Sequence, residues 1–306
     1  MNSLRNKILV AVDFEEHSMN AFQQACQLAR ICNAEILSLY VIEPLDNLYK
    51  HIAIEDYINK MVLQAREKFD ELVKQDNQKD KKCKIPVANL ILKGKPYEKI
   101  LEVANDYGVL MIVMGKTGID TFRKSKYIGS NTYNVIREAK CPVVSMDNKS
   151  NVGKLKNLLI PVDLEKNYEN QLDTAASFAS NFASALNIFT VFNVKNVVDR
   201  IIKLSNNNKL RKRLKKKNVN FNIDAIRLQK SHSISKYILS KSEQVNADMI
   251  IISTQQKKDI VNCFIGSTAQ KIINKSKIPV LSIMPDAKLR LCPDNNQGKL
   301  ENDKEN

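Results

Sequence analysis

Two short clusters of glycine and small polar residues have the types and spacing to hold a phosphate. Residues 114–118 read Met-Gly-Lys-Thr-Gly and end an apolar run, and residues 129–131 read Gly-Ser-Asn and open a helical pattern. Glycines let a backbone approach a phosphate and adopt positive φ. The first N–H groups of a helix bind anions, and the Ser130 hydroxyl adds a donor. On spacing alone, a plain strand–turn–helix connection explains the same residues.

The sequence lacks the residue patterns of the common catalytic and metal-binding sites. The chain has no Walker motif, no G-x-S-x-G and no carboxylate–His pair at a strand end, so no catalytic nucleophile or base is identified. Its six cysteines form no C-x-x-C pair, and its three histidines are scattered. We therefore predict free thiols acting as small core residues, no metal centre and no catalytic residues.

An internal repeat organises the chain. Residues 7–14 (KILVAVDF) match residues 157–164 (NLLIPVDL), each an apolar run ending in Val-Asp. Near the end of each half, Ile-Gly-Ser opens a helical pattern and a Pro-led apolar run follows, at residues 141–146 and 278–283. A duplication of this kind predicts two copies of one fold.

Strands and helices alternate in each half. Continuous apolar runs are typical of strands buried on both faces of a parallel sheet. Predicted strands are residues 7–14, 36–42, 87–92, 109–114 and 141–146, then 157–164, 188–194, 221–228, 249–253 and 278–283. Predicted helices include one with Ser18 as its N-cap, a long one over 54–72, and others at 97–105 and 234–244.

The fold class is therefore α/β, with two tandem doubly wound, parallel-sheet (Rossmann-like) domains, each a five-stranded sheet flanked by helices. We predict domains at 1–148 and 155–285, joined by a polar linker. A disordered polar tail is expected at 286–306, where Asn, Asp, Lys and Glu dominate. Ligands in such folds bind beyond the carboxyl ends of the strands, where we expect Asp13, at the end of the first strand, to face the same cleft as the glycine clusters and to hold a nucleoside.

These motifs, in this order, make the chain resemble the universal stress protein family in its tandem form over residues 5–285. The family pattern is G-x2-G-x9-G-[S/T], and the resemblance implies ATP binding in one branch and no nucleotide in another. Carried onto this sequence, it implies ATP, with or without Mg²⁺, near these residues of the first domain: Asp13, Val41, Met114, Gly115, Gly118, Gly129, Ser130 and Asn131.

Both halves depart from that pattern. In the first, ten residues separate Gly118 from Gly129, and Leu110 replaces the usual Asp. In the second, residues 253–257 (STQQK) stand where the paired glycines belong, Thr254 is matched to Gly115, and Asn193 is matched to Val41. Side chains at that turn would block phosphates, so we expect no nucleotide in the second domain and one ATP per chain.

Charge gives weaker guidance. The net charge is +15, spread along the chain, with one dense run at residues 211–217. The run lacks aromatics for base stacking, which favours a solvated helix end over contact with nucleic acid or lipid. Lys116, Arg123, Lys124 and Lys126 are either phosphate contacts or plain surface. We find no signal peptide and no membrane-length apolar run, and expect a cytoplasmic protein.

Two functions stay open. The first is a regulatory protein of the stress response that binds ATP, or a related adenine nucleotide, as a ligand, with at most very slow hydrolysis. The second is a nucleotide-free module acting through its surface and assembly. In either case the two last strands, short, apolar and Pro-led, are expected to pair within one chain. Further homo-oligomers remain open, and no membrane or specific nucleic-acid partner is expected.

Overall fold

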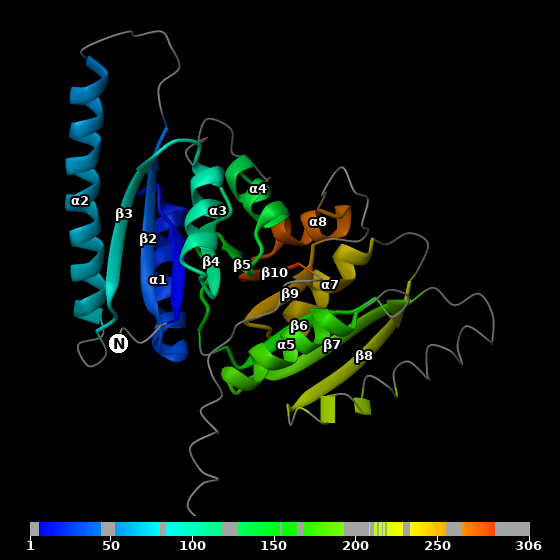
Figure 1. The fold of residues 1–306 in the computed structure, drawn as a ribbon. Coiled ribbons are helices and arrows are strands. Elements are labelled where there is room, and N and C mark those ends of the chain that lie inside the picture. The colour runs from blue at the N-terminus through cyan, green and yellow to red at the C-terminus, as the bar shows by residue number, and fades with distance from the viewer. Residues whose placement is uncertain are drawn as a thin grey trace, which may run out of the picture.

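The computed structural model describes residues 6–43, 53–79, 84–117, 128–153, 155–163, 168–192, 208, 211–212, 214–215, 217, 219–228, 233–254 and 265–284. The predicted tail, residues 286–306, lies outside them. The strands form one ten-stranded sheet in the order β3-β2-β1-β4-β5-β10-β9-β6-β7-β8. Figure 1 shows β5 and β10 at its centre and one domain on either side.

The first domain contributes five parallel strands. They are β1 (Lys7–Ala11), β2 (Glu35–Ile42), β3 (Val87–Lys93), β4 (Met111–Gly115) and β5 (Val143–Met146). The intervening helices are α1 (Glu16–Cys32), α2 (Ala53–Lys79), α3 (Pro96–Asp106) and α4 (Ser130–Glu138). Neighbouring strands are parallel, with Ile8 opposite both Ile36 and Met111.

The second domain repeats this order. Its strands are β6 (Asn157–Pro161), β7 (Ala185–Phe192), β8 (Phe221–Arg227), β9 (Met249–Ser253) and β10 (Val280–Ile283). Its helices include α5 (Glu169–Asn181), α7 (Ile234–Gln244) and α8 (Ser267–Lys275). The predicted fold class, two doubly wound five-stranded units, is confirmed. The predicted strand and helix ends differ from the observed ones by one to a few residues, apart from the long helix, which extends to Lys79.

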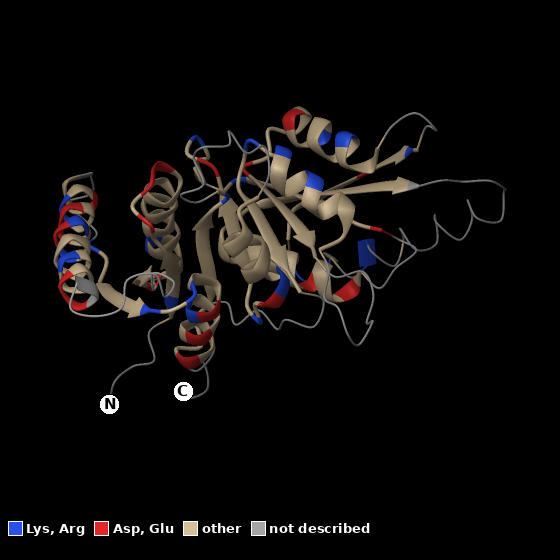
Figure 2. Cartoon of the chain, turned by 90° about the horizontal axis from the view of Figure 1, so that it is seen from above, with Lys and Arg blue, Asp and Glu red and all other residues tan. Residues whose placement is uncertain are grey.

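The sheet separates two apolar cores. One core buries side chains of α1, α2 and α5, such as Phe22, Phe69 and Phe178. The other buries side chains of α3, α4, α7 and α8, such as Val103 and Ile272. Alternate residues of each strand serve the two cores, because side chains alternate across a sheet. Both faces are thus covered by helices, and the charged residues lie mainly on helices and turns (Figure 2).

The two domains meet through their last strands. β10 pairs antiparallel with β5, and Leu281 lies opposite Val144. The other pairs among the described strands are parallel. The predicted pairing within one chain is confirmed, and it makes the two domain cores continuous on both faces of the sheet.

Three further expectations can be compared with the structure. Cys26 and Cys32 are buried cysteines outside any disulfide, as predicted, and Cys141 is a half-buried one. None of the helices in the described ranges combines the length and the apolarity needed to cross a bilayer. Of the basic run, Leu214 is fully buried while Arg211 and Lys212 are exposed.

Candidate functional site

Asp13 ends the first strand and organises the start of α1. Its Oδ1 accepts hydrogen bonds from the Ser18 hydroxyl and from the Glu15 N–H, the latter at 3.0 Å. The prediction of Ser18 as N-cap is wrong: the helix begins at Glu16 with Glu15 as N-cap. The Asp13 carboxylate draws Ser18 inward, and Phe14 takes a left-handed φ of 63°, so the helix starts earlier than expected.

Gly115, at the end of β4, lies against the first turn of α1. A β-carbon on it would be 2.9 Å from His17 Cβ and 3.2 Å from the Ser18 nitrogen. Such a contact is shorter than folded proteins tolerate, so glycine is required here for close packing of helix and strand. Sequence reasoning assigned Gly115 to phosphate clearance and missed this packing role.

The first turn of α4 approaches Gly115 from the other side. The Thr132 hydroxyl donates to the Gly115 carbonyl at 2.8 Å. Gly129 is the N-cap of α4, with no side-chain cap hydrogen bond. The first N–H groups of a helix have no intrahelical acceptor, so the amides at Ser130 and Asn131 are suited to an external anion. Two helix N-termini therefore meet at the end of β4.

Val41 and Met114 pack in the same core, on the α3 and α4 face of the sheet. Met114 is 5% exposed and Val41 is half-buried. The match of Asn193 to Val41 is wrong. Ala11 lies opposite Leu39 and Pro161 opposite Phe189, so Val191, two residues further on, is the counterpart of Val41. The apolar wall of the site is thus kept in both domains.

Lys116 is neither a phosphate contact nor plain surface. It is 5% exposed, and its Nζ donates to the Ser276 carbonyl in the second domain and lies 3.9 Å from Asp147 Oδ2. Burial lowers its pKa, and Asp147 acts in the opposite direction. Nothing in the local sequence distinguishes this lysine from an exposed one. Gly118, Arg123, Lys124 and Lys126 lie outside the described residues.

The second domain keeps the closure between strand and helix but differs at two of its residues. The Gly129 N–H donates to the Lys116 carbonyl at 2.8 Å, and the Gly266 N–H donates to the Thr254 carbonyl at 3.3 Å. These matched bonds correct the alignment by one residue, because Thr254 corresponds to Lys116. Ser253 therefore takes the place of Gly115, and Ala269 that of Thr132.

The helix after the first strand of the second domain also starts later. α5 begins at Glu169, although the counterpart of Ser18 is Tyr168. Ser253, the counterpart of Gly115, carries a β-carbon, whereas Gly115 has none and packs closely against α1. Tyr168, which stands where Ser18 stands in α1, is the N-cap of α5 and precedes its first turn. Asp163, the counterpart of Asp13, is exposed.

Comparisons with known proteins agree with this geometry. The model of the universal stress protein family matches residues 5–145 and again 154–283. Universal stress protein MJ0577 of Methanocaldococcus jannaschii is 27% identical over 166 residues, which cover 49% of this chain and 99% of that protein. Universal stress protein YxiE of Bacillus subtilis is 26% identical over 144 residues, or 45% of this chain and 97% of that protein.

A solved structure resembles the whole tandem. The crystal structure of a universal stress protein from Archaeoglobus fulgidus covers 92% of this chain and 98% of its own, with a TM-score of 0.70 and 21% identity. That identity supports the fold alone. Because the family model matches both halves, the chain belongs to the universal stress protein family, as a tandem two-domain member.

Proposed function

We propose that this chain is a regulatory protein of the stress response that binds one ATP, or a related adenine nucleotide, in its first domain. The observation that carries the proposal is the meeting of the α1 and α4 N-termini at Gly115. Both helix dipoles direct partial positive charge to one point. A triphosphate placed there would accept hydrogen bonds from the amides of Ser130 and Asn131.

The remaining proposed contacts are compatible with a nucleoside. Asp13 uses Oδ1 for Ser18 and Glu15, so its other oxygen is suited to accept from a sugar hydroxyl. Val41 and Met114 would supply the apolar wall beside the base. Gly118 is proposed for the phosphate loop from the family pattern alone. Mg²⁺ would come with the nucleotide, since no group of three potential metal ligands gathers in the described part of the chain.

ATP in this proposal is a ligand and not a rapidly hydrolysed substrate. We expect any hydrolysis to fall far below the usual enzyme range of roughly 1–1000 per second. A turnover of several per second that a single substitution in this chain abolishes would contradict this. The alternative, a nucleotide-free interaction module, is favoured by the altered second domain.

Calorimetric titration with ATP tests the proposal, with Asp13→Asn and Asp163→Asn as a matched pair. The wild type should bind one ATP per chain. Asp13→Asn should weaken binding about tenfold or more, as expected for loss of a charged hydrogen-bond acceptor, and Asp163→Asn should leave the affinity unchanged. Thermal unfolding of each variant checks that the fold persists.

Three results would argue against the proposal. A stoichiometry of two would place a site in each domain. Equal effects of the two substitutions would remove the assignment to the first domain. No heat of binding, together with no nucleotide released from heat-denatured, freshly purified protein by mass spectrometry, would favour the nucleotide-free module.

A further inference from the structure

The connection from β4 to α4 closes through a short neck. Its two sides are Lys116 and Gly129, joined by the hydrogen bond from the Gly129 N–H to the Lys116 carbonyl. Lys116 is further tied to the sheet, since its N–H donates to the Met146 carbonyl at 2.8 Å. The position of the neck sets the position of the first turn of α4, because Gly129 is the N-cap of that helix.

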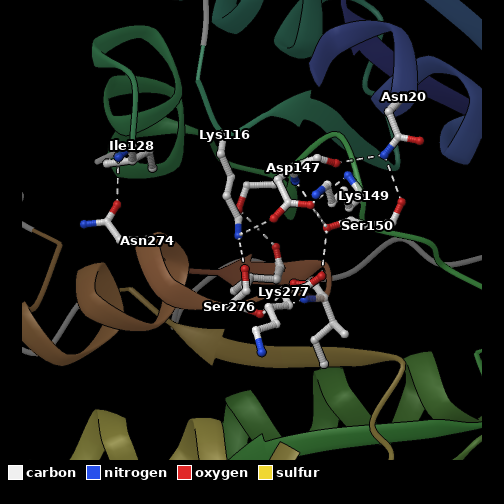
Figure 3. Close-up of polar contacts among 12 residues, drawn as sticks. Asn20, Lys116, Ile128, Asp147, Lys149, Ser150, Asn274, Ser276 and Lys277 are labelled. Carbon is white, nitrogen blue, oxygen red and sulfur yellow. Dashed lines mark hydrogen bonds and ion pairs between the residues drawn. The ribbon is translucent and has the colours of Figure 1, made fainter. Parts of the chain in front are cut away.

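The second domain holds both sides of this neck through the C-terminal end of α8 (Figure 3). On one side, Lys116 Nζ donates to the carbonyl of Ser276, which is the C-cap of α8. On the other side, the Ile128 N–H donates to Asn274 Oδ1 at 2.7 Å. A helix C-terminus favours a cation, which suits the ammonium group of Lys116.

These contacts have no equivalent in the opposite direction among the described residues. Thr254, the counterpart of Lys116, directs its hydroxyl to Ile283 within its own domain. Arg137, the counterpart of Asn274, bonds to Glu138 and lies over the ring of Tyr133. Among the described residues, the second domain thus contacts the neck of the first domain, and the first domain makes no matching contacts to the second.

The buried lysine makes this support depend on a closed interface. A buried ammonium is costly unless it keeps its partners, and two of its partners are the Ser276 carbonyl and Asp147. Asp147 is itself fixed: its Oδ1 accepts from the Ser150 hydroxyl at 3.0 Å, and its carbonyl accepts from Asn20 of α1 at 2.8 Å. The network therefore joins α8, the linker and α1.

We propose that the second domain acts as a brace for the nucleotide site of the first. Asn274 and Ser276 fix the neck, and the neck fixes the α4 amides that would bind the phosphates. The inference rests on the proposed function, since it assumes a nucleotide at α4. It assigns the altered second domain a task, and it makes Asn274 and Lys116 positioning residues.

Coupling of this kind is reciprocal. If a correctly held neck favours ATP, then ATP favours a correctly held neck. Bound ATP should therefore slow exchange of the Ile128 amide hydrogen, although Ile128 is held by a residue of the other domain.

The test compares Asn274→Ala with Arg137→Ala, which alters the equivalent position of the first domain. ATP affinity is measured by calorimetry, and exchange of the Ile128 amide is followed by nuclear magnetic resonance in the ligand-free full chain. We expect Asn274→Ala to weaken ATP binding about fivefold, a typical effect of one lost hydrogen bond, and to speed exchange at Ile128. Arg137→Ala should change neither.

The possible outcomes separate the two proposals. If the wild type binds ATP and Asn274→Ala binds it equally well, the brace has no role in binding and the inference fails. If the wild type binds no ATP, the proposed function fails and takes the role in binding with it; unchanged Ile128 exchange in Asn274→Ala would then also deny the brace itself.

A second variant covers a failure of Asn274→Ala to fold. Lys116→Met replaces the ammonium by an apolar side chain one atom shorter, and Asp147, its partner at 3.9 Å, has a side chain that is 27% exposed and that water can solvate. This variant should lower ATP affinity in the same direction while the unfolding midpoint stays near that of the wild type. Full ATP affinity in Lys116→Met would overturn the inference.

Discussion

Leu281 lies directly opposite Val144, where β10 pairs antiparallel with β5. Both side chains are fully buried, and each belongs to the last strand of its domain. This pair lies at the centre of the interface between the two domains. If the domains were separate, β5 and β10 would each be an unpaired edge strand.

Separating the domains should therefore expose two apolar edges. We expect residues 1–150 and 151–306, expressed apart, to self-associate or aggregate, because an unpaired apolar edge strand recruits another strand. Sedimentation equilibrium measures this, with the full chain as reference. A first half that stays monomeric at high concentration would show that β5 does not need a partner.

Gly115 gives a prediction about stability. Gly115→Ala places a β-carbon 2.9 Å from His17 Cβ and 3.1 Å from the His17 carbonyl carbon. Because backbone must shift, we expect a loss of about 1–3 kcal/mol in the free energy of unfolding, as for other overpacked sites. Denaturant titration measures it.

Ser253→Ala is the matched control for that substitution. The second domain already carries a β-carbon at this position, so the change should stay within about 0.5 kcal/mol. Equal losses in the two variants would mean that the close packing of α1 on Gly115 is not what matters.

Sequence reasoning succeeded where the signal is local or repeated. Apolar runs ending in Val-Asp located β1 and β6, and the repeated Ile-Gly-Ser located the starts of α4 and α8. It failed where side-chain contacts decide. The expected N-cap, Ser18, lies inside α1, which begins at Glu16, and its hydroxyl donates to Asp13 instead of capping the helix. The expectation for Lys116, a phosphate contact or plain surface, missed its partner Ser276, which is 160 positions away.

Cys141 should be unreactive in the folded protein. Burial raises its pKa from 9.0 to about 12, so the reactive thiolate is scarce at pH 8.5. Iodoacetamide should label it slowly in native protein and rapidly in denaturant, as read by peptide mass spectrometry. Complete native labelling within minutes would contradict the raised pKa of this thiol.

The same shift gives a dependence of stability on pH. Above pH 9 the unfolded chain releases the Cys141 proton while the folded chain retains it, so folding loses stability between pH 9 and about 12. Below pH 9 the contribution is constant. The free energy of unfolding of the Cys141→Ser variant should therefore fall less steeply with pH in that window. Denaturant unfolding at a series of pH values measures it.

In the basic run at residues 211–217, Leu214 should serve the fold, whereas the exposed charges of Arg211 and Lys212 should not. Leu214 is fully buried, and Lys217 lies 3.5 Å from Asp173 Oδ1 of α5. Changing Arg211, Lys212 and Arg213 to Ser should leave stability and ATP affinity unchanged, whereas Leu214→Ala should cost about 2–5 kcal/mol.

Nucleic-acid binding tests the other reading of this run. We expect no tight DNA or RNA binding at about 200 mM salt, where nonspecific phosphate contacts weaken strongly. Binding that persists at that salt in the wild type and is lost in the triple Ser variant would show that the run recognises nucleic acid.

The pairing of β5 with β10 within one chain affects how the interface depends on protein concentration and how mutations reach the two domains. Two separate subunits joined along such strands would part as their concentration falls, and both copies would carry the same mutations. Here the junction lies within one polypeptide, so its occupancy does not depend on how much protein a cell makes. One domain can then lose a feature by mutation while the other keeps it. Because β5 and β10 pair with each other, neither of these two edges can pair with a strand of another protein.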